Sequence, residues 1–231
     1  MPQDAFDPRR LTGRLAGQVS RRTFSGALAL SPLAAALLTP AHAATATVAT
    51  RATVGQAAPD FSARDTSGKA HKLGDFKGKL VVLEWTNPGC PFVVKHYSGN
   101  MQALQKEFTG KGVVWLAVNS TATDSADYHP ASQLAGWMKE KGGSPTSTLM
   151  DEASNIGQLY SAKTTPHMYI VSPQGVLVYA GAIDSIASAR ESDIVTATNY
   201  VRQGLNESLV NKPVSQATTR AYGCSVKYKS A

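Results

Sequence analysis

Apolar residues along the chain gather in short continuous or alternating runs that are typical of strands. Two extended runs flank the turn-rich residues 65–69, which predicts a β-hairpin. Two later runs flank Pro173, Gln174 and Gly175, which predicts a second antiparallel hairpin. Altogether we expect strands over residues 61–64, 70–73, 79–86, 113–119, 148–150, 167–172 and 176–180.

Other segments carry apolar residues at spacings of three and four, which is the period of an amphipathic helix. The clearest begins at Pro91, a residue suited to the first turn of a helix, and continues to Phe108. Another ends at Gly142 and Gly143, which are typical of a helix C-terminus. We expect helices over residues 91–108, 132–141, 156–161 and 194–209.

The order of these elements predicts an α/β fold with a mixed central sheet, helices on both faces and an N-terminal β-hairpin. We expect one domain over residues 54–212, preceded by an Ala/Thr-rich linker at residues 44–53. Residues 213–231 lack a hydrophobic period and are expected to form a C-terminal tail that carries Cys224. The length of 231 residues and the 42% hydrophobic composition suit a globular protein with a proper core.

Residues 1–43 have the layout of an export signal. Arg21 and Arg22 precede an apolar stretch at residues 26–38, and a small-residue triplet ends at Ala43. The arginine pair resembles a twin-arginine signal, although the general secretion route also fits. The apolar stretch is shorter than the roughly 20 residues that span a bilayer. We therefore expect cleavage after Ala43, a periplasmic or otherwise exported mature protein, and no stable membrane anchor.

The charge of the chain does not indicate a nucleic-acid partner. There are 23 Lys and Arg against 16 Asp and Glu, which gives a net charge of +7. Five of the arginines and two of the aspartates lie in residues 1–43, so the remaining chain carries only +4. Such a surplus is no electrostatic footprint for DNA, and the sequence has no phosphate-loop motif that would indicate a nucleotide cofactor.

The two cysteines of the chain, Cys90 and Cys224, are the main candidates for chemistry. In an oxidising compartment an even cysteine count indicates a disulfide or thiol redox chemistry. Cys90 lies in the turn between the strand expected at residues 79–86 and the helix expected at residues 91–108. The N–H groups and dipole at a helix N-terminus favour a thiolate, so the pKa of a cysteine there falls from about 8.5 towards neutrality. The position therefore predicts a nucleophilic Cys90.

Four short motifs, each weak alone, occur along the chain in a specific order. They are VGQAAPDF at residues 54–61, Cys90-Pro91, TTP at residues 164–166 and SPQG at residues 172–175. In this order they resemble the thioredoxin-like superfamily, specifically its redoxin or AhpC/TSA branch, over about residues 54–210. The resemblance implies a thioredoxin-like three-layer fold and a thiol-dependent oxidoreductase that needs no metal or organic cofactor.

The resemblance also implies where a substrate would bind. It implies a cis peptide bond between Thr165 and Pro166, opposite Cys90, that presents backbone to an incoming disulfide or peptide. Pro91, beside the sulfur, belongs to the same expected binding site. Trp85 would add an apolar landing surface for a partner, or would simply pack in the core.

Three polar residues near Cys90 have alternative interpretations. Glu84 lies where thioredoxins have a buried acid that relays protons, but a carboxylate at the rim paired with a lysine also fits. Lys95 and His96 follow on the predicted helix, where they would lower the pKa of Cys90 or shuttle a proton. A solvated helix face is the alternative for both.

The family pattern breaks at Val93, which stands where a resolving cysteine would close a vicinal disulfide with Cys90. Cys224 is then the remaining intramolecular partner. Three arrangements stay open, namely a redox-active pair, a static disulfide and two unpaired thiols. A static bond closing a loop of 134 residues would stabilise the fold by about 5 kcal/mol in the chain-entropy model.

A hydroperoxide is the alternative substrate that the family brings in. Peroxiredoxins typically place a threonine three residues and a proline seven residues before the reactive cysteine, together with a distal arginine. Here those positions hold Asn87 and Leu83, and Arg190 is an unanchored stand-in for the arginine. A copper(I) site made by the two cysteines and His167 is a weaker hypothesis, because no close ligand pair supports it, and we expect no metal.

The sequence therefore predicts an exported thiol-disulfide oxidoreductase in which Cys90 attacks a protein disulfide and Cys224 resolves the mixed disulfide. An external thiol would serve as the reductant. One alternative is a peroxiredoxin-like hydroperoxide reductase. The other is a non-catalytic redoxin-fold binding module whose disulfide is structural.

Overall fold

The computed structural model describes residues 51–229, so the predicted export signal and residues 44–50 of the predicted linker lie outside it. Its strands are β1 (Ser62–Asp65), β2 (Ala70–Lys72), β3 (Val81–Trp85), β4 (Val114–Asn119), β5 (Ser147–Met150), β6 (Thr164–Thr165), β7 (His167–Val171), β8 (Leu177–Gly181) and β9 (Cys224–Ser225). Its helices are α1 (Pro91–His96), α2 (Asn100–Gly110), α3 (Ala131–Glu140), α4 (Asn155–Leu159) and α5 (Tyr200–Leu209), with 3-10 helices η1 (Leu73–Phe76) and η2 (Glu191–Val195). No helix in this range is long and apolar enough to cross a membrane.

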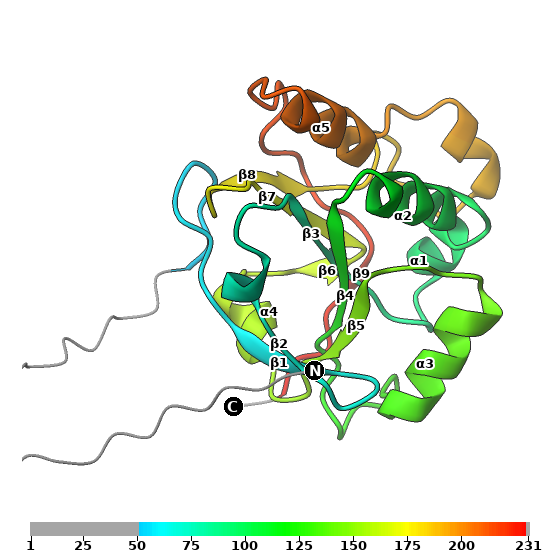
Figure 1. Ribbon diagram of the computed structural model, residues 1–231. Coiled ribbons are helices and arrows are strands. Elements are labelled where there is room, and N and C mark those ends of the chain that lie inside the picture. Colours follow the sequence, from blue (N-terminus) through cyan, green and yellow to red (C-terminus); the bar gives the residue numbers. More distant parts are fainter. Residues whose placement is uncertain (1–50, 230–231) are drawn as a thin grey trace, which may run out of the picture. The chain divides into compact units, whose positions relative to one another are not determined.

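Seven strands form one mixed sheet in the order β2-β1-β5-β4-β3-β7-β8, with helices on both sides (Figure 1). The central strands β3, β4 and β5 are parallel, whereas the β1-β2 and β7-β8 hairpins are antiparallel. β6 and β9 form a separate two-stranded sheet. The predicted α/β class, mixed sheet and N-terminal hairpin are confirmed.

Side-chain alternation along β3 builds the cores on both faces of the sheet. Val82 points into the core beneath α1, α2 and α5, whereas Leu83 and Trp85 point into the core beneath α4. All five residues of β3 are buried, which explains why its sequence is continuously apolar apart from Glu84. The strand thus ends, at the centre of the fold, directly before the loop that carries Cys90.

Two helices are shorter than the sequence pattern predicts. The helix expected over residues 91–108 is interrupted between α1 and α2, where Gly99 has a φ of 137° that other residues rarely adopt. The helix expected over residues 194–209 starts only at Tyr200, after η2, and Asn199 caps it by accepting a hydrogen bond from the N–H of Arg202. The apolar spacing continues across both breaks, so periodicity alone could not locate them.

The C-terminal tail, residues 213–229, packs along the domain. It leaves α5 and runs beside β8, where the N–H of Ala180 donates to the carbonyl of Ala217 at 3.1 Å. It then forms β9 next to β6 (Figure 1). Beyond β9 the phenol of Tyr228 donates to the carbonyl of Ala162 at 2.5 Å. The tail is therefore held on both sides of Cys224.

Candidate active site around Cys90

Cys90 is the N-cap residue of α1 and is 2% exposed. The loop before it is held by Asn87, whose side chain accepts from the N–H of Gly89 and donates to Thr121 Oγ1, both at 2.8 Å. Pro91 occupies the first turn of the helix, where its missing N–H costs nothing. The sulfur therefore lies at the positive end of a short helix, as the sequence predicts.

The segment before Pro166 lies directly against the sulfur. The Thr165–Pro166 peptide bond is cis, and the Cys90 thiol donates to the carbonyl of Thr165 at 3.0 Å. β9 pairs antiparallel with β6 in a register that puts Cys224 opposite Thr165. Both cysteines are free thiols, and Cys224 is one of the groups that lower the pKa of Cys90. The fold thus brings the two cysteines together across Thr165.

The two thiols have opposite acidities. Burial alone would raise the pKa of Cys90, but hydrogen bonds from the side chains of Thr165 and Cys224 and from the N–H groups of Cys224 and Val93 bring it below its ordinary value. Burial and the adjoining Cys90 raise the pKa of Cys224 to about 11. Cys90 is therefore the thiol that ionises first.

A small polar pocket of about 90 Å³ lies beside the sulfur of Cys90. Its walls come from the loops after β3 and β4, from β6 and from the tail, and include Thr86, Ser120, Thr121, Asp127 and Lys227. The hydroxyl oxygen of Thr86 is buried and has no hydrogen-bond partner among residues 51–229. A buried hydroxyl is normally paired, so Thr86 is an exception among the residues of the pocket wall.

Glu84, in the middle of β3, is fully buried. Its carboxylate accepts hydrogen bonds from Tyr97 Oη (2.7 Å), Trp115 Nε1 (2.7 Å) and Gln105 Nε2 (3.0 Å). Burial raises the pKa of Glu84, and the three hydrogen bonds act in the opposite direction without cancelling it. The alternative of a rim carboxylate paired with a lysine is wrong.

A family model described as AhpC/TSA family matches residues 54–180, which is more than half of the chain. The chain belongs to the AhpC/TSA family. Thioredoxin-like protein YneN of Bacillus subtilis (strain 168) is 30% identical over 123 residues, which make up 53% of this chain and 68% of YneN. Thiol-disulfide oxidoreductase ResA of the same organism is 28% identical over 124 residues, or 54% of this chain and 64% of ResA.

Solved structures support the same fold. The crystal structure of an uncharacterized conserved protein from Geobacillus kaustophilus superposes with a TM-score of 0.67 at 25% identity and covers 78% of this chain and 94% of that one. The thioredoxin-like fold and the redoxin family predicted from the motifs are confirmed. With its family and relatives, the chain falls in the class of thiol-dependent oxidoreductases.

Lys95 and His96 of this AhpC/TSA protein do not lie on a solvated helix face. Both are buried, and neither is among the groups that set the pKa of Cys90. Lys95 Nζ lies 3.4 Å from Asp184 Oδ2, and His96 Nε2 lies 3.1 Å from the hydroxyl of Tyr222. Their partners are therefore a loop after β8 and the C-terminal tail.

Trp85 does not form part of the pocket. Its side chain has no exposed surface, and its indole N–H donates to Ser120 Oγ at 3.0 Å. The ring packs against Tyr160 and Tyr169, in the core on the other face of the sheet from Cys90. The expectation that Trp85 contacts a substrate is corrected to a packing role, because alternation along β3 turns it away from the sulfur.

The other candidates from the sequence also lie elsewhere. Arg190 forms an exposed ion pair with Asp193 and does not line the pocket. His167 is buried, its Nδ1 accepts from the N–H of Lys163 at 3.2 Å, and burial lowers its pKa to about 4. Within the described part of the chain, no three His, Cys, Asp or Glu side chains are grouped to hold a metal ion.

Sequence reasoning missed much of the pocket wall. Thr121 and Asp127 come from an irregular segment after β4 that has no motif or period. The tail did carry a signal, because Tyr222, Cys224, Val226 and Tyr228 alternate with small or polar residues. That alternation is typical of an extended segment packed on one side, which is how the tail lies against β6.

Proposed function

We propose that this AhpC/TSA protein is an exported thiol-disulfide oxidoreductase in which Cys90 is the nucleophile and Cys224 the resolving cysteine. The observation that carries the proposal is the pairing of Cys224 with Thr165, whose carbonyl lies 3.0 Å from Cys90 Sγ. The relatives YneN, a thioredoxin-like protein, and ResA, a thiol-disulfide oxidoreductase, support the same chemistry. The layout of residues 1–43 supports export.

The reaction starts with the Cys90 thiolate. It attacks one sulfur of a substrate disulfide, so that a Cys90–substrate disulfide forms and the other substrate sulfur leaves as a thiolate that takes up a proton. Cys90 is then uncharged, which removes one of the causes that raise the pKa of Cys224. Deprotonated Cys224 attacks Cys90 Sγ, and the substrate leaves as a thiolate that takes up a proton. Two external thiol groups are then oxidised to a disulfide and supply the two electrons that reduce the Cys90–Cys224 disulfide.

Glu84 is the proposed proton relay between the pocket and the protein interior. Thr86, which follows β3 directly and lines the pocket, comes two positions after Glu84 in the chain. The phenol of Tyr97 donates to the Glu84 carboxylate at 2.7 Å, and burial and that carboxylate raise the pKa of the phenol. We expect protons to reach Glu84 through the hydroxyl of Tyr97.

Replacing Glu84 by glutamine is expected to lower turnover by about 10-fold, because proton transfer during resolution loses its buried acid. The pH profile of turnover should lose the limb that belongs to Glu84, while the alkylation rate of Cys90 stays unchanged.

The stability of the folded protein should change as well. A carboxyl whose pKa is raised by folding stabilises the folded state at low pH, and this contribution is lost as the pH rises. Urea unfolding of Glu84→Gln should therefore depend less on pH as the pH rises above the ordinary pKa of a glutamate, about 4.

Trp115→Phe is the matched control for the relay. It keeps the carboxyl but removes the 2.7 Å indole hydrogen bond that favours its ionised form. Its pH limb should move to higher pH instead of disappearing. A Glu84→Gln protein with the wild-type pH profile would show that Glu84 is only structural.

Replacing Cys224 by serine is expected to trap the mixed disulfide, because the group that releases the substrate is gone. Incubation with a peptide containing one disulfide should give a covalent adduct at Cys90, detected by mass spectrometry of the acid-quenched protein. Turnover should fall about 10- to 100-fold, to the rate at which an added thiol resolves the adduct. Ser225→Ala, a change at the exposed neighbour, should behave as wild type.

The absence of any adduct in Cys224→Ser, together with unchanged turnover, would contradict the resolving role. A loss of folding without any change in exchange chemistry would instead favour the structural disulfide of a binding module. Thermal unfolding of the oxidised and reduced wild type provides that comparison.

A hydroperoxide is the second candidate substrate, and the small pocket beside Cys90 favours it. The thiolate would attack one peroxide oxygen, the O–O bond would break, and the other oxygen would leave as hydroxide or alkoxide and take up a proton to give water or an alcohol. The sulfenic acid at Cys90 would then condense with the Cys224 thiol to give a disulfide and water. Peroxide consumption and peptide-disulfide reduction, both driven by dithiothreitol, separate the two substrates. The faster of the two reactions identifies the substrate class.

A further inference from the structure

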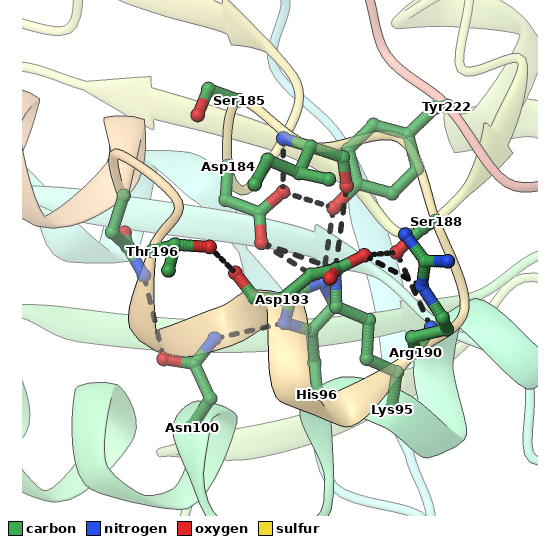
Figure 2. A network of polar contacts seen from close by, with 12 residues as sticks. Lys95, His96, Asn100, Asp184, Ser185, Ser188, Arg190, Asp193, Thr196 and Tyr222 are labelled. Atoms are coloured by element: carbon green, nitrogen blue, oxygen red, sulfur yellow. Dashed lines mark hydrogen bonds and ion pairs between the residues drawn. The ribbon is translucent and has the colours of Figure 1, made fainter.

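Lys95, His96 and Asp184 form a buried polar cluster that takes no part in the reaction proposed above (Figure 2). The cluster binds Tyr222, which lies two residues before Cys224 in the tail. The hydroxyl of Tyr222 donates to Asp184 Oδ1 and lies 3.1 Å from His96 Nε2. The other carboxylate oxygen of Asp184 lies 3.4 Å from Lys95 Nζ. Lys95, His96 and Asp184 are each at most 3% exposed. Tyr222 therefore attaches the tail to a buried hydrogen-bond network and not to surface groups.

The hydrogen bonds of this cluster have a fixed direction. The side-chain amide of Asn100 donates to His96 Nδ1 at 2.8 Å, which leaves the proton of the ring on Nε2. Burial lowers the pKa of His96 to about 4, so the ring is neutral at ordinary pH. His96 therefore donates to the hydroxyl of Tyr222, and that hydroxyl donates to Asp184. Such a network accepts a phenol in one position only.

The backbone between Tyr222 and Cys224 consists of Gly223 alone, which has a φ of 130°. Gly223 packs against the carbonyl of Thr165, the group that also accepts from the Cys90 thiol. The ring of Tyr222 additionally packs edge-on against Phe92, in the first turn of α1, with ring centroids 5.8 Å apart. The place where Tyr222 is bound therefore decides where the sulfur of Cys224 lies.

We propose that Tyr222 is a positioning residue for the resolving step, held by the Lys95, His96 and Asp184 cluster. The inference rests on the proposed resolving role of Cys224. In that step the Cys90–substrate S–S bond breaks, the Cys90–Cys224 bond forms, and the substrate leaves as a thiolate. Holding one reactant next to the other raises its effective concentration, so the cluster favours the intramolecular disulfide over mixed disulfides with free thiols.

Tyr222→Phe tests this proposal, because it removes one hydroxyl and keeps the aromatic packing. The protein is equilibrated in glutathione redox buffers, acid-quenched, alkylated and analysed by mass spectrometry. We expect the equilibrium constant of the Cys90–Cys224 disulfide against glutathione to fall about 10-fold. In a Cys90→Ser background, we expect Cys224 to react about 10-fold faster with iodoacetamide, because the tail leaves its site more often.

Tyr160→Phe is the matched control, because it also deletes a tyrosine hydroxyl, but one that lies outside the tail. That hydroxyl donates to the carbonyl of Pro59 at 2.7 Å. It should leave the equilibrium constant unchanged. An equal constant in wild type and Tyr222→Phe would overturn the proposal even where Cys224→Ser traps its adduct. If Cys224→Ser traps no adduct, the resolving role of Cys224 fails. The rate at which Cys224 reacts with iodoacetamide would still show whether Tyr222 holds the tail in place.

Discussion

Replacing Cys90 by serine is expected to lower the turnover of a disulfide-containing peptide by at least about 1,000-fold. The serine hydroxyl stays protonated at neutral pH, even with the hydrogen bonds that favour a thiolate at this site. The variant therefore has no nucleophile to attack the disulfide. The fold should persist, because serine is close in size to the cysteine it replaces. The measurement is the release of peptide thiols with dithiothreitol as reductant, followed by mass spectrometry.

Cys224→Ser is the control that separates attack from resolution. It should still release one equivalent of peptide thiol per protein in a single burst, whereas Cys90→Ser should release none. In the wild type, the alkylation rate of Cys90 should rise with a midpoint below the pKa of an ordinary cysteine, as the direction of its shift requires. Turnover by Cys90→Ser above a tenth of the wild-type value would disprove the nucleophilic role.

The parts of the site that could be predicted from the sequence are those set by local rules. The apolar run before Cys90 required a buried strand, and Pro91 required a helix start, so the position of the sulfur followed from neighbouring residues. The motif resemblance added the cis bond between Thr165 and Pro166. These inferences needed no knowledge of how distant segments pack.

The parts that could not be predicted depend on distant packing. The contact between His96 and Tyr222 joins residues 126 positions apart, and Asp184 between them lies in a loop without any motif. Glu84 shows the same limit, because a lone acid in an apolar strand fits either a rim or a core position. Its three buried hydrogen-bond donors decide the matter, and two of them come from α2 and β4.

The tail explains why Cys90 is so little exposed in a protein proposed to act on disulfides. β9 pairs with Thr164 and Thr165, the segment that the family resemblance assigns to an incoming peptide. The tail therefore occupies the position that the resemblance assigns to a substrate strand, and it forms one wall of the pocket. A peptide would have to displace it, whereas a small thiol or hydroperoxide would not.

Gly223→Ala is expected to detach the tail and slow formation of the Cys90–Cys224 disulfide by at least about 100-fold. A Cβ atom at this position would lie 2.1 Å from the carbonyl oxygen of Thr165, which is backbone and cannot rotate away. The φ of 130° adds strain for any residue with a side chain. Loss of the hydrogen bonds from Cys224 should also raise the pKa of Cys90 and move its alkylation midpoint to higher pH.

The same variant should affect the two half-reactions in opposite directions. Because the edge of β6 is then uncovered, the first attack on a peptide disulfide should become faster, which is measured as the rate of thiol release in the burst. Overall turnover should fall, because Cys224 no longer lies next to Cys90. Gly68→Ala is the matched control, because its φ of 87° imposes similar strain in open space, in the hairpin between β1 and β2. A Gly223→Ala protein that forms its disulfide as fast as Gly68→Ala would show that Cys224 reaches Cys90 without the β6-β9 pairing.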